Sequence, residues 1–385
     1  TGDLEAGDGA LTITIDGETA IDAAIGWTPE ELTIDAEARP GRWPGFERLD
    51  QLLGGPALIT ASTERPIRDS VDGARVRIDA PNLDGRVTHA GGRRLELDID
   101  EAAGLARAAG LDIASLQGDG VLDLSGPIRF DGRATAQDLA RGPFSFGAVE
   151  SPLQVQWADG ELSGRADLDA TGATARPARL DQLLGDTPSL EAGFLWSRAE
   201  RRFALSDAAL EAAAGPLNGR AAFDYGSGAL EAEAQSEALD LSAIDPSLEG
   251  LAEAELAVSG PVSGPLQITL DTTAREPGGA LARLGEGEAR LQLDGAWRDG
   301  ALQADTIVLQ SPALALQASG RLGSETRLSG DYAWSGGAPV DAVAITGALA
   351  GAFEAGYADG ALDLRVQARA ERLEAGPALF DQPRL

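Results

Sequence analysis

The sequence contains no cysteine and a single histidine, His89. Without cysteine the chain can form neither a disulfide framework nor a thiolate metal site, a composition that fits an exported bacterial protein as well as a cytosolic one. Zinc sites need clusters of His or Cys, and the acidic residues lack the spacing of calcium-binding loops. We therefore expect no metal and no cofactor.

Catalytic patterns are also missing. His89 would have to serve as the base of any Ser-His-Asp triad, but it stands beside Gly91–Arg93 in an apparent hairpin turn, so we interpret it as a solvated loop residue. The glycine-rich segment Ser335–Gly337 lacks the lysine and the following helix of a phosphate loop. We predict that the protein is not an enzyme.

Carboxylates are plentiful, and a glycosidase-like pair of acidic residues is the alternative to that prediction. Several of them fall on the polar phase of alternating segments, which favours a solvated outer face. These residues are Asp98, Asp100, Asp167, Asp169 and Asp294.

Lysine and methionine are absent as well. All 31 basic residues are arginine, and only two asparagines occur, which is typical of a GC-rich genome and suggests a bacterial source. The formal net charge of -31 disfavours DNA, RNA and anionic lipid headgroups as partners, and we expect no nucleic-acid partner. Without methionine, we expect the chain to begin after a processing or truncation point. No run approaches 18 apolar residues and no leader pattern opens the chain, so an anchor or signal peptide is expected outside this segment.

What the sequence does contain is a regular alternation of apolar and polar residues. A period of two indicates strands with one buried face, and Asp-Gly, Gly-Pro and Ser-Gly turn signals between them indicate hairpins. Aromatic residues make up only 5% of the chain, so the predicted buried layer is thin and aliphatic. Clear examples of the alternation occur at residues 11–15, 95–99, 266–270, 291–293, 314–316 and 362–366.

A repeated hairpin motif supports the same fold. It consists of an aromatic residue, a few turn residues and a strand that begins with leucine, and it occurs at residues 27–32, 157–162, 225–230, 297–302 and 357–362. We interpret the aromatic rings as a cover for the hairpin end of the apolar layer, with stacking on sugars as the alternative.

A second motif predicts short helices. Arg48–Gly54 recurs as Arg179–Gly185 and, weakened, as Leu281–Gly285. Together with Glu101–Ala109 and Leu239–Leu248, these segments predict helices of one to three turns that cap the edge of the sheet. No linker divides the chain. We predict one continuous repeat-built β segment over residues 1–385, with roughly thirty strands and no separate globular domains, as a fragment of a longer chain.

The continuous apolar phase is the candidate functional surface. A contiguous exposed apolar strip marks a binding surface, and a sheet that curls on itself would turn the strip into a groove suited to another aliphatic chain. The candidate residues that line this groove are Leu95, Leu97, Ile99, Leu266, Ile268, Leu270, Leu291, Leu293, Leu314, Leu316, Leu362, Leu364 and Val366.

The repeats resemble those of the TamB family in the AsmA-like superfamily, particularly its alphaproteobacterial members. The resemblance covers nearly all of the chain. Its order of a Leu-Gly segment, a strand, an aromatic hairpin and further strands is complete at residues 284–297, 301–308 and 314–320. The pair of segments at residues 256–261 and 263–270 is similar to the joints between repeats in that family.

The resemblance implies an elongated all-β fold, with a repetitive antiparallel sheet curled into a taco-like or groove-shaped β-solenoid and a few short helices. Family members carry an inner-membrane anchor and a terminal domain that meets the outer-membrane protein TamA. Neither end is recognisable here, so the chain resembles the middle of such a protein. A periplasmic location is implied, with the inner-membrane anchor and the contact to a TamA-like partner both in parts outside this chain.

Three functions follow as hypotheses. The leading one is a periplasmic groove that shields phospholipid acyl chains and conducts them between the inner and outer membranes, linked to outer-membrane biogenesis. The first alternative is a chaperone or scaffold that binds outer-membrane protein strands by β-augmentation. The second is the stalk of a repetitive surface adhesin, for which we would expect a closed β-helix with a packed interior.

Overall fold

The structure is a computed structural model that describes residues 6–28, 30–42, 53–63, 72–108, 111–176, 178–285, 287–340, 343–358, 361–375 and 378–381. Most of these residues form strands, which belong to one antiparallel sheet of 25 strands with a few short helices between them. This confirms the predicted all-β class. Among the described residues, no helix is long and apolar enough to cross a membrane.

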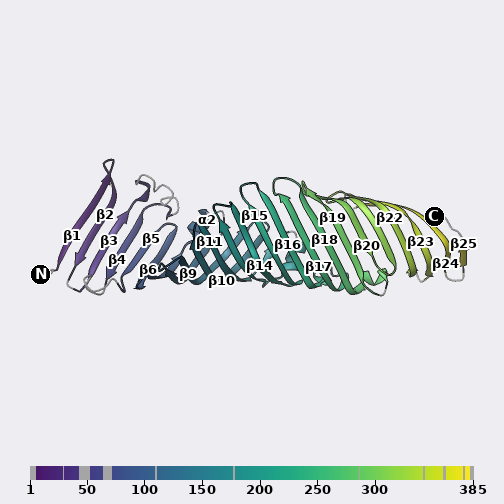
Figure 1. The fold of residues 1–385 in the computed structure, drawn as a ribbon, viewed down its shortest axis with the longest axis horizontal. Helices are drawn as coiled ribbons and strands as arrows, with labels where there is room; N and C mark the ends of the chain where they lie inside the picture. Colours follow the sequence, from purple (N-terminus) through teal and green to yellow (C-terminus); the bar gives the residue numbers. More distant parts are fainter. Residues whose placement is uncertain are drawn as a thin grey trace. The chain divides into compact units, whose positions relative to one another are not determined.

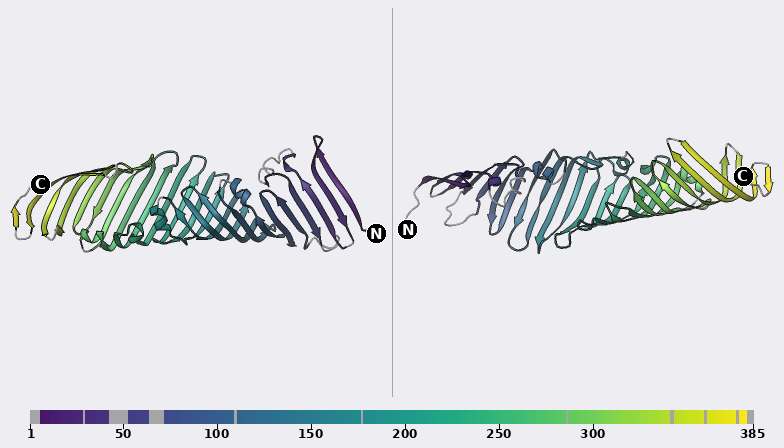
Figure 2. Two further views of the ribbon diagram at one scale, coloured as in Figure 1. Left: turned by 180° about the vertical axis from the view of Figure 1, so that it is seen from behind. Right: turned by 90° about the horizontal axis from the view of Figure 1, so that it is seen from above.

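The chain divides into two compact units, and we describe each by itself. Unit 1 comprises Thr1–Asp181 and Asp186–Leu195, and unit 2 comprises Gln182–Gly185 and Trp196–Leu385. Within each unit, Figures 1 and 2 show strands that follow one another in the sequence lying side by side.

The elements of unit 1 are β1 (Gly7–Ile15), β2 (Glu18–Trp27), β3 (Leu32–Ala38), the 3-10 helix η1 (Pro40–Arg42), β4 (Ala57–Thr63), β5 (Arg75–Ala80), β6 (Leu83–Gly91), β7 (Arg94–Glu101), α2 (Ala103–Ala108), β8 (Ser115–Asp123), β9 (Ile128–Arg141), β10 (Phe144–Ala158), β11 (Glu161–Thr171) and β12 (Thr174–Ala175). The next elements along the chain are α3 (Ala178–Leu184) and β13 (Ser189–Ser197).

The elements of unit 2 are β14 (Arg202–Ala212), β15 (Gly215–Asp224), β16 (Ala229–Asp240), α4 (Leu241–Ile244), β17 (Leu248–Pro261), β18 (Leu266–Gly279), the 3-10 helix η2 (Ala280–Leu284), β19 (Ala289–Arg298), β20 (Ala301–Gln310), β21 (Leu314–Leu322), β22 (Thr326–Val340), β23 (Val343–Ala358), β24 (Ala361–Ala375) and β25 (Ala378–Asp381).

The turns explain why consecutive strands pair as hairpins. Asp159 and Gly160 have φ values of 53° and 83°, and Asp299 and Gly300 have values of 51° and 75°. Two consecutive positive φ values are what a type I′ turn requires, and the twist of that turn matches the twist of the strands it joins. These Asp-Gly pairs therefore close the β10–β11 and β19–β20 hairpins, as the turn signals predicted.

Bulges preserve the alternation where a strand carries extra residues. On β20, Ala304 pairs with Gly320 and Ile307 pairs with Ala318, so the two paired positions are three residues apart on β20 and two apart on β21. Such a bulge adds a residue without turning the rest of the strand over. Ala304 and Ile307 are accordingly both buried, in one cluster with Ala318.

Most of the short helices lie where the sequence predicts them, and η1 is an exception. Helices α2 and α4 fall within the predicted segments Glu101–Ala109 and Leu239–Leu248, and η2 covers most of Leu281–Gly285. The first predicted helix, Arg48–Gly54, lies outside the described residues except for its last two. Because hairpins alternate between the two edges of an antiparallel sheet, η1 and α2 lie at one edge of unit 1, and α4 and η2 lie at one edge of unit 2. We call this side of each unit the helix edge.

The buried residues are few and mostly small, because the buried layer of the sheet is thin. The core consists mostly of alanine, and its three clusters each combine one strand face with neighbouring elements. Two clusters lie at the helix edge: Ala103 and Ala106 of α2 pack on Ala136 of β9, and Leu241 of α4 packs with Ala252 and Ala274. The helices thus cover the ends of the strands, which agrees with their predicted role as edge caps.

Glycines within the strands mark places where neighbouring backbones come very close. A Cβ atom added to Gly330 of β22 would overlap the carbonyl oxygen of Gln317 on β21. The same addition to Gly356 of β23 would meet nothing closer than 4.0 Å. Gly330 stands opposite Ala318 and Phe353, on the apolar phase, whereas Gly356 lies on the polar phase, because its neighbours Ala355 and Tyr357 pair with leucines.

These two positions give a matched test of the packing. Replacement Gly330→Ala is expected to lower the free energy of unfolding of unit 2 by about 1–3 kcal/mol, since overpacking forces the backbone to shift. Replacement Gly356→Ala is expected to raise it by about 0.5–1 kcal/mol, because alanine loses less conformational entropy than glycine on folding. Urea titration, followed by hydrogen exchange of the β22 amides, measures both changes in the free energy of unfolding. Equal effects of the two variants would contradict the assignment of Gly330 to the crowded apolar phase and of Gly356 to the polar phase.

Candidate functional site

One face of unit 2 is apolar along an unbroken row of paired residues. Leu256, Leu270, Leu293, Ile307 and Ala318 stand directly opposite one another on β17 to β21. Directly paired residues in an antiparallel sheet project from the same face. The row continues over β22 to β24 through residues of the same phase, so the face is shared by eight consecutive strands.

The structure places all ten predicted residues of unit 2 on this face. Leu270 of β18 pairs directly with Leu293 of β19, and the other predicted residues of unit 2 pair with residues that were not predicted. Leu314 and Leu316 follow across β20, and Leu362, Leu364 and Val366 follow on β24 across β22 and β23. The β24 residues are the most exposed of the set, with Leu362 at 68%.

The alternation did not reveal several members of the face. Ile307 and Ala304 were missed because the bulge on β20 sets them three residues apart, which breaks a pattern of every second residue. Phe353 was missed because Gly351 and Ala355 flank it on the same phase, and Tyr332 was missed because Gly330 precedes it on that phase. Phe353 nonetheless packs in the cluster that contains Leu293 and Leu316. The recurring glycines were the signal that could have found these strands.

Unit 1 carries an apolar face of the same kind. The predicted residues Leu95, Leu97 and Ile99 lie on β7 and pair with Leu122, Gly120 and Gly118 of β8. The face extends over β9 and β10, where Phe130 pairs with both Leu122 and Val155. All three predicted residues are half-buried.

A hollow opens on this face of unit 1, next to the helix edge. It has a volume of about 180 Å³ and lies between Leu97, Ile99, Ala102, Leu116, Phe130 and Leu153. Glycines make room for it: Gly118 of β8 contributes no side chain, and the ring of Phe130 lies over Gly120, where an added Cβ would approach it to 2.7 Å. An apolar hollow of this size is comparable with the roughly 150 Å³ cavity that takes up benzene in another protein.

The aromatic residues of the repeated hairpin lie at the opposite edge of each unit from the short helices. Trp157 pairs with Leu162 in unit 1, and Trp297 pairs with Leu302 in unit 2, each at the ends of its strands. Their exposed fractions are 39% and 43%, so the rings stand at the boundary between the apolar face and water. We call this side the aromatic edge.

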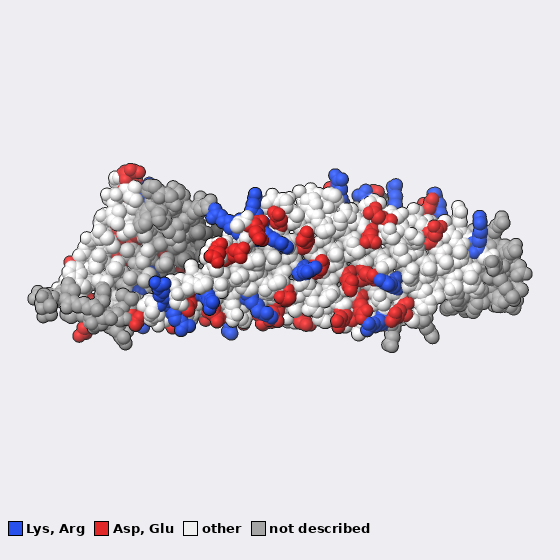
Figure 3. All heavy atoms as spheres, in the orientation of Figure 1, with Lys and Arg blue, Asp and Glu red and all other residues white. Residues whose placement is uncertain are grey.

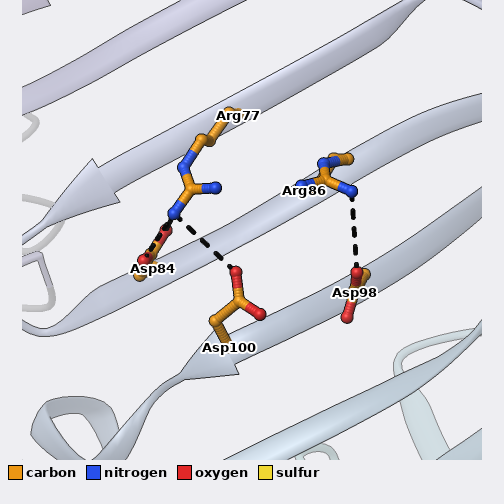
Figure 4. A network of polar contacts seen from close by, with 5 residues as sticks. All are labelled: Arg77, Asp84, Arg86, Asp98 and Asp100. Atoms are coloured by element: carbon orange, nitrogen blue, oxygen red, sulfur yellow. Dashed lines mark hydrogen bonds and ion pairs between the residues drawn. The ribbon is translucent and has the colours of Figure 1, made fainter.

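The opposite face is charged. Figure 3 shows arginine side chains interspersed with aspartate and glutamate over one side of the molecule. On β5 to β7, Arg77 contacts both carboxylate oxygens of Asp84 at 2.9 and 2.8 Å and lies 3.8 Å from Asp100, while Arg86 lies 4.0 Å from Asp98 (Figure 4). The five aspartates predicted to lie on a solvated face, among them Asp98 and Asp100, are all exposed.

Unit 2 has a comparable ion pair between neighbouring strands. Arg290 of β19 donates hydrogen bonds to the carboxylate of Asp271 on β18 at 3.1 and 2.5 Å, and Gln292 donates a third at 3.0 Å. The hydrogen bonds from Arg290, and next those from Gln292, lower the pKa of Asp271 below its usual 3.8. The pair is largely open to water, so its contribution to stability is modest.

His89 does not occupy the position predicted for it. It belongs to β6 and stands opposite Leu95, with only 18% of its side chain exposed. Its Nδ1 lies 3.1 Å from Oδ1 of Asp72, and its Nε2 lies 3.2 Å from the carbonyl oxygen of Gly92. The interpretation as a solvated loop residue is wrong, because β6 includes His89 and continues to Gly91, and the turn begins only at Gly92.

Neither a metal-binding cluster nor a similar known protein gives a further indication of function. Within the part of the chain that the structure describes, no group of three or more His, Asp or Glu residues could hold a metal ion. Comparison of the chain with protein-family models, with curated proteins and with solved structures finds no match.

The Asp271–Arg290 pair predicts a pH-dependent stability. A carboxylate with a lowered pKa in the folded state stabilises it above the usual pKa, and this contribution is lost as the pH falls through the folded-state value. Replacement Asp271→Asn should therefore lower the free energy of unfolding of unit 2 at neutral pH by less than about 1 kcal/mol, as measured by urea titration, and have no effect well below pH 3.8. Asp294→Asn, at an exposed position on the same face, is the control. A constant difference between wild type and Asp271→Asn at all pH values would contradict the mechanism.

Proposed function

We propose that the protein shields the acyl chains of phospholipids on its apolar face and lets them move across the strands, as part of lipid transport in the bacterial periplasm that supports outer-membrane biogenesis. The observation that carries this proposal is the apolar face of each unit. A sheet normally buries such a face against a second layer. Here, among the described residues, only short helices pack on it, and they do so at one edge.

The energetics of the face suit a ligand that must be held and released. Transfer of a CH₂ group from water to an apolar surface is worth about 0.8 kcal/mol. This free energy does not depend on the orientation of the group relative to the surface. A chain that moves from the row of Leu270 and Leu293 to that of Ile307 and Leu316 exchanges one aliphatic contact for another. Transfer therefore needs no catalytic group, in keeping with the absence of an active-site motif in the sequence.

The crowding of the apolar face supports a curled, groove-like sheet. Cβ atoms would overlap neighbouring carbonyl oxygens at Gly330 and Gly351, whereas Gly356 on the polar phase has open space. Bending a sheet toward one face brings the residues on that face together and spreads those on the other. Glycine within a strand is the usual means of allowing such a bend.

The location follows from the resemblance described above and rests on it alone. In a TamB-like protein this chain would be a middle part of the periplasmic segment, anchored to the inner membrane and joined to a TamA-like partner through parts outside it. The adhesin alternative required a closed β-helix, and the antiparallel hairpins, in which β1 pairs only with β2 among the described strands, are against it.

Site-specific photocrosslinking tests the proposal directly. A photoreactive residue at Ile268, Leu293 or Leu316, in full-length chain expressed in cells, is expected to capture phospholipid at least about fivefold more than one at Asp98 or Asp294, because only the apolar face desolvates a CH₂ group. Mass spectrometry of the adducts identifies the lipid. Equal capture at the leucine and aspartate positions would refute lipid shielding, and capture of polypeptide instead would favour the chaperone alternative.

A further inference from the structure

The single histidine occupies a ring position of the repeated hairpin. Trp27 of β2 and Trp157 of β10 each pair with the first leucine after their turn, at the aromatic edge of unit 1. His89 of β6 pairs in the same way with Leu95 of β7. The three rings therefore stand at the ends of β2, β6 and β10, which are separated by the same number of strands.

His89 differs from the other rings of the repeat because it can change its charge. The segment from His89 to Leu95 has one residue more than the hairpin motif, and a register shift between His89 and Gly91 absorbs it. The ring lies on the same phase of β6 as Val87, which pairs with Leu97 of the apolar face. An ionisable ring thus stands at the end of the apolar layer of unit 1.

Both ring nitrogens of His89 face oxygen atoms. Nδ1 lies 3.1 Å from Oδ1 of Asp72, which precedes β5, and Nε2 lies 3.2 Å from the carbonyl oxygen of Gly92. Nδ1 is buried, and within the described part of the chain it has no hydrogen bond with favourable angles. The contact between Nδ1 and the Asp72 carboxylate is therefore electrostatic.

Only the protonated ring suits both contacts. Carboxylate and carbonyl oxygens accept hydrogen bonds, and neutral imidazole has a single N–H, so one of its nitrogens must turn a lone pair toward an oxygen. Imidazolium has an N–H at both nitrogens and brings a positive charge next to the Asp72 carboxylate. Because Nδ1 is shielded from water, the neutral ring cannot replace the lost contact with one to solvent.

His89 is the group that changes charge in this region near neutral pH. Guanidinium and carboxylate groups keep their charge between about pH 5.5 and 8, whereas imidazole does not. Arg75 of β5 and Glu96 of β7 both pair with Thr88, so they lie on the opposite phase from His89. Arg94 of β7 lies on that opposite phase too, and Arg93 is exposed in the turn. Among the described residues, the charged group that faces the ring is Asp72.

The contact fastens the lead-in to β5 onto β6. The backbone N–H of Gly73 donates to the carbonyl oxygen of His89, and the backbone N–H of His89 donates to the carbonyl oxygen of Ala74, both at 2.8 Å. These bonds extend the β5–β6 pairing beyond Arg75, where β5 begins, toward the aromatic edge. The end of a paired segment opens with a lower free energy than its middle, so a single added contact changes its opening measurably.

We propose that His89 and Asp72 form a pH-sensitive latch at the aromatic edge of unit 1. The imidazolium attracts the Asp72 carboxylate and holds the Gly73–Ala74 segment on β6, beside Leu95. The closed state binds the proton more tightly than the open state, so closure is favoured at low pH. This contribution is lost as the pH rises through the range in which imidazole loses its proton. The latch controls access to the apolar face from this edge, whatever ligand the face takes.

Nuclear magnetic resonance tests the latch in the intact chain, because a single histidine gives unambiguous imidazole signals. Their chemical shifts report the protonation of His89, and hydrogen exchange, corrected for the intrinsic rate, reports opening at the Gly73 and His89 amides. Protection of both amides should fall about two- to fivefold between about pH 5.5 and 8, in step with the loss of the proton, as expected for a partly exposed ion pair. Amides of β10 near Trp157 are the reference. Unchanged protection at Gly73 and His89, or an equal change in the reference, would overturn the latch.

Two variants separate the ring from its charge. His89→Phe keeps an aromatic ring opposite Leu95 but cannot titrate, so protection of the Gly73 amide should become independent of pH. Asp72→Asn removes the carboxylate and should lower protection at about pH 5.5 to the level that wild type shows at about pH 8. Asp98→Asn, on the polar phase of β7, is the control and should behave as wild type. Persistent pH dependence in His89→Phe would refute the role of the imidazole, and in Asp72→Asn it would refute the ion pair.

Discussion

The structure depends on keeping the alternation of side chains in phase from one strand to the next. In an antiparallel sheet, a slip of one residue moves every side chain of a strand to the other face. Most hairpins here preserve the phase through tight turns such as Asp159-Gly160, and bulges restore it where the strand has extra residues. On β14, for example, Leu205 and Ala208 both pair with residues of the apolar phase across a register shift. The continuous apolar face is a product of many such local corrections.

The two faces are stabilised in different ways. On the polar face, ion pairs such as Arg77–Asp84 and Arg220–Glu233 link neighbouring strands, but they are exposed and each adds little. On the other face, aliphatic side chains exclude water from one another, and among the residues that the structure describes no second layer of strands lies above them. The backbone ladder therefore provides the regular framework, and the apolar contacts along it provide most of the stabilisation that is specific to this sequence.

The sequence predicts the strands, hairpins and short helices because each is encoded locally. Alternation placed Leu95–Ile99 and Leu266–Leu270 on the correct phase. The segments that were predicted as helices, Glu101–Ala109 and Leu239–Leu248, contain α2 and α4. The bulge on β20 escaped prediction because its cause is the pairing with β21, which a single strand does not reveal. The position of His89 escaped it because the turn predicted at Gly91–Arg93 was taken to include His89, whereas β6 contains His89 and continues to Gly91.

The candidate site shows the same division between local and non-local information. The residues that line the apolar face could be read from periodicity, but the hollow beside α2 could not. It arises because glycines on β8 and the ring of Phe130 on β9 meet a helix that follows β7, and these elements are brought together only by the register of the sheet. A face that is uniform in its sequence pattern thereby acquires a local feature that only the pairing of the strands creates.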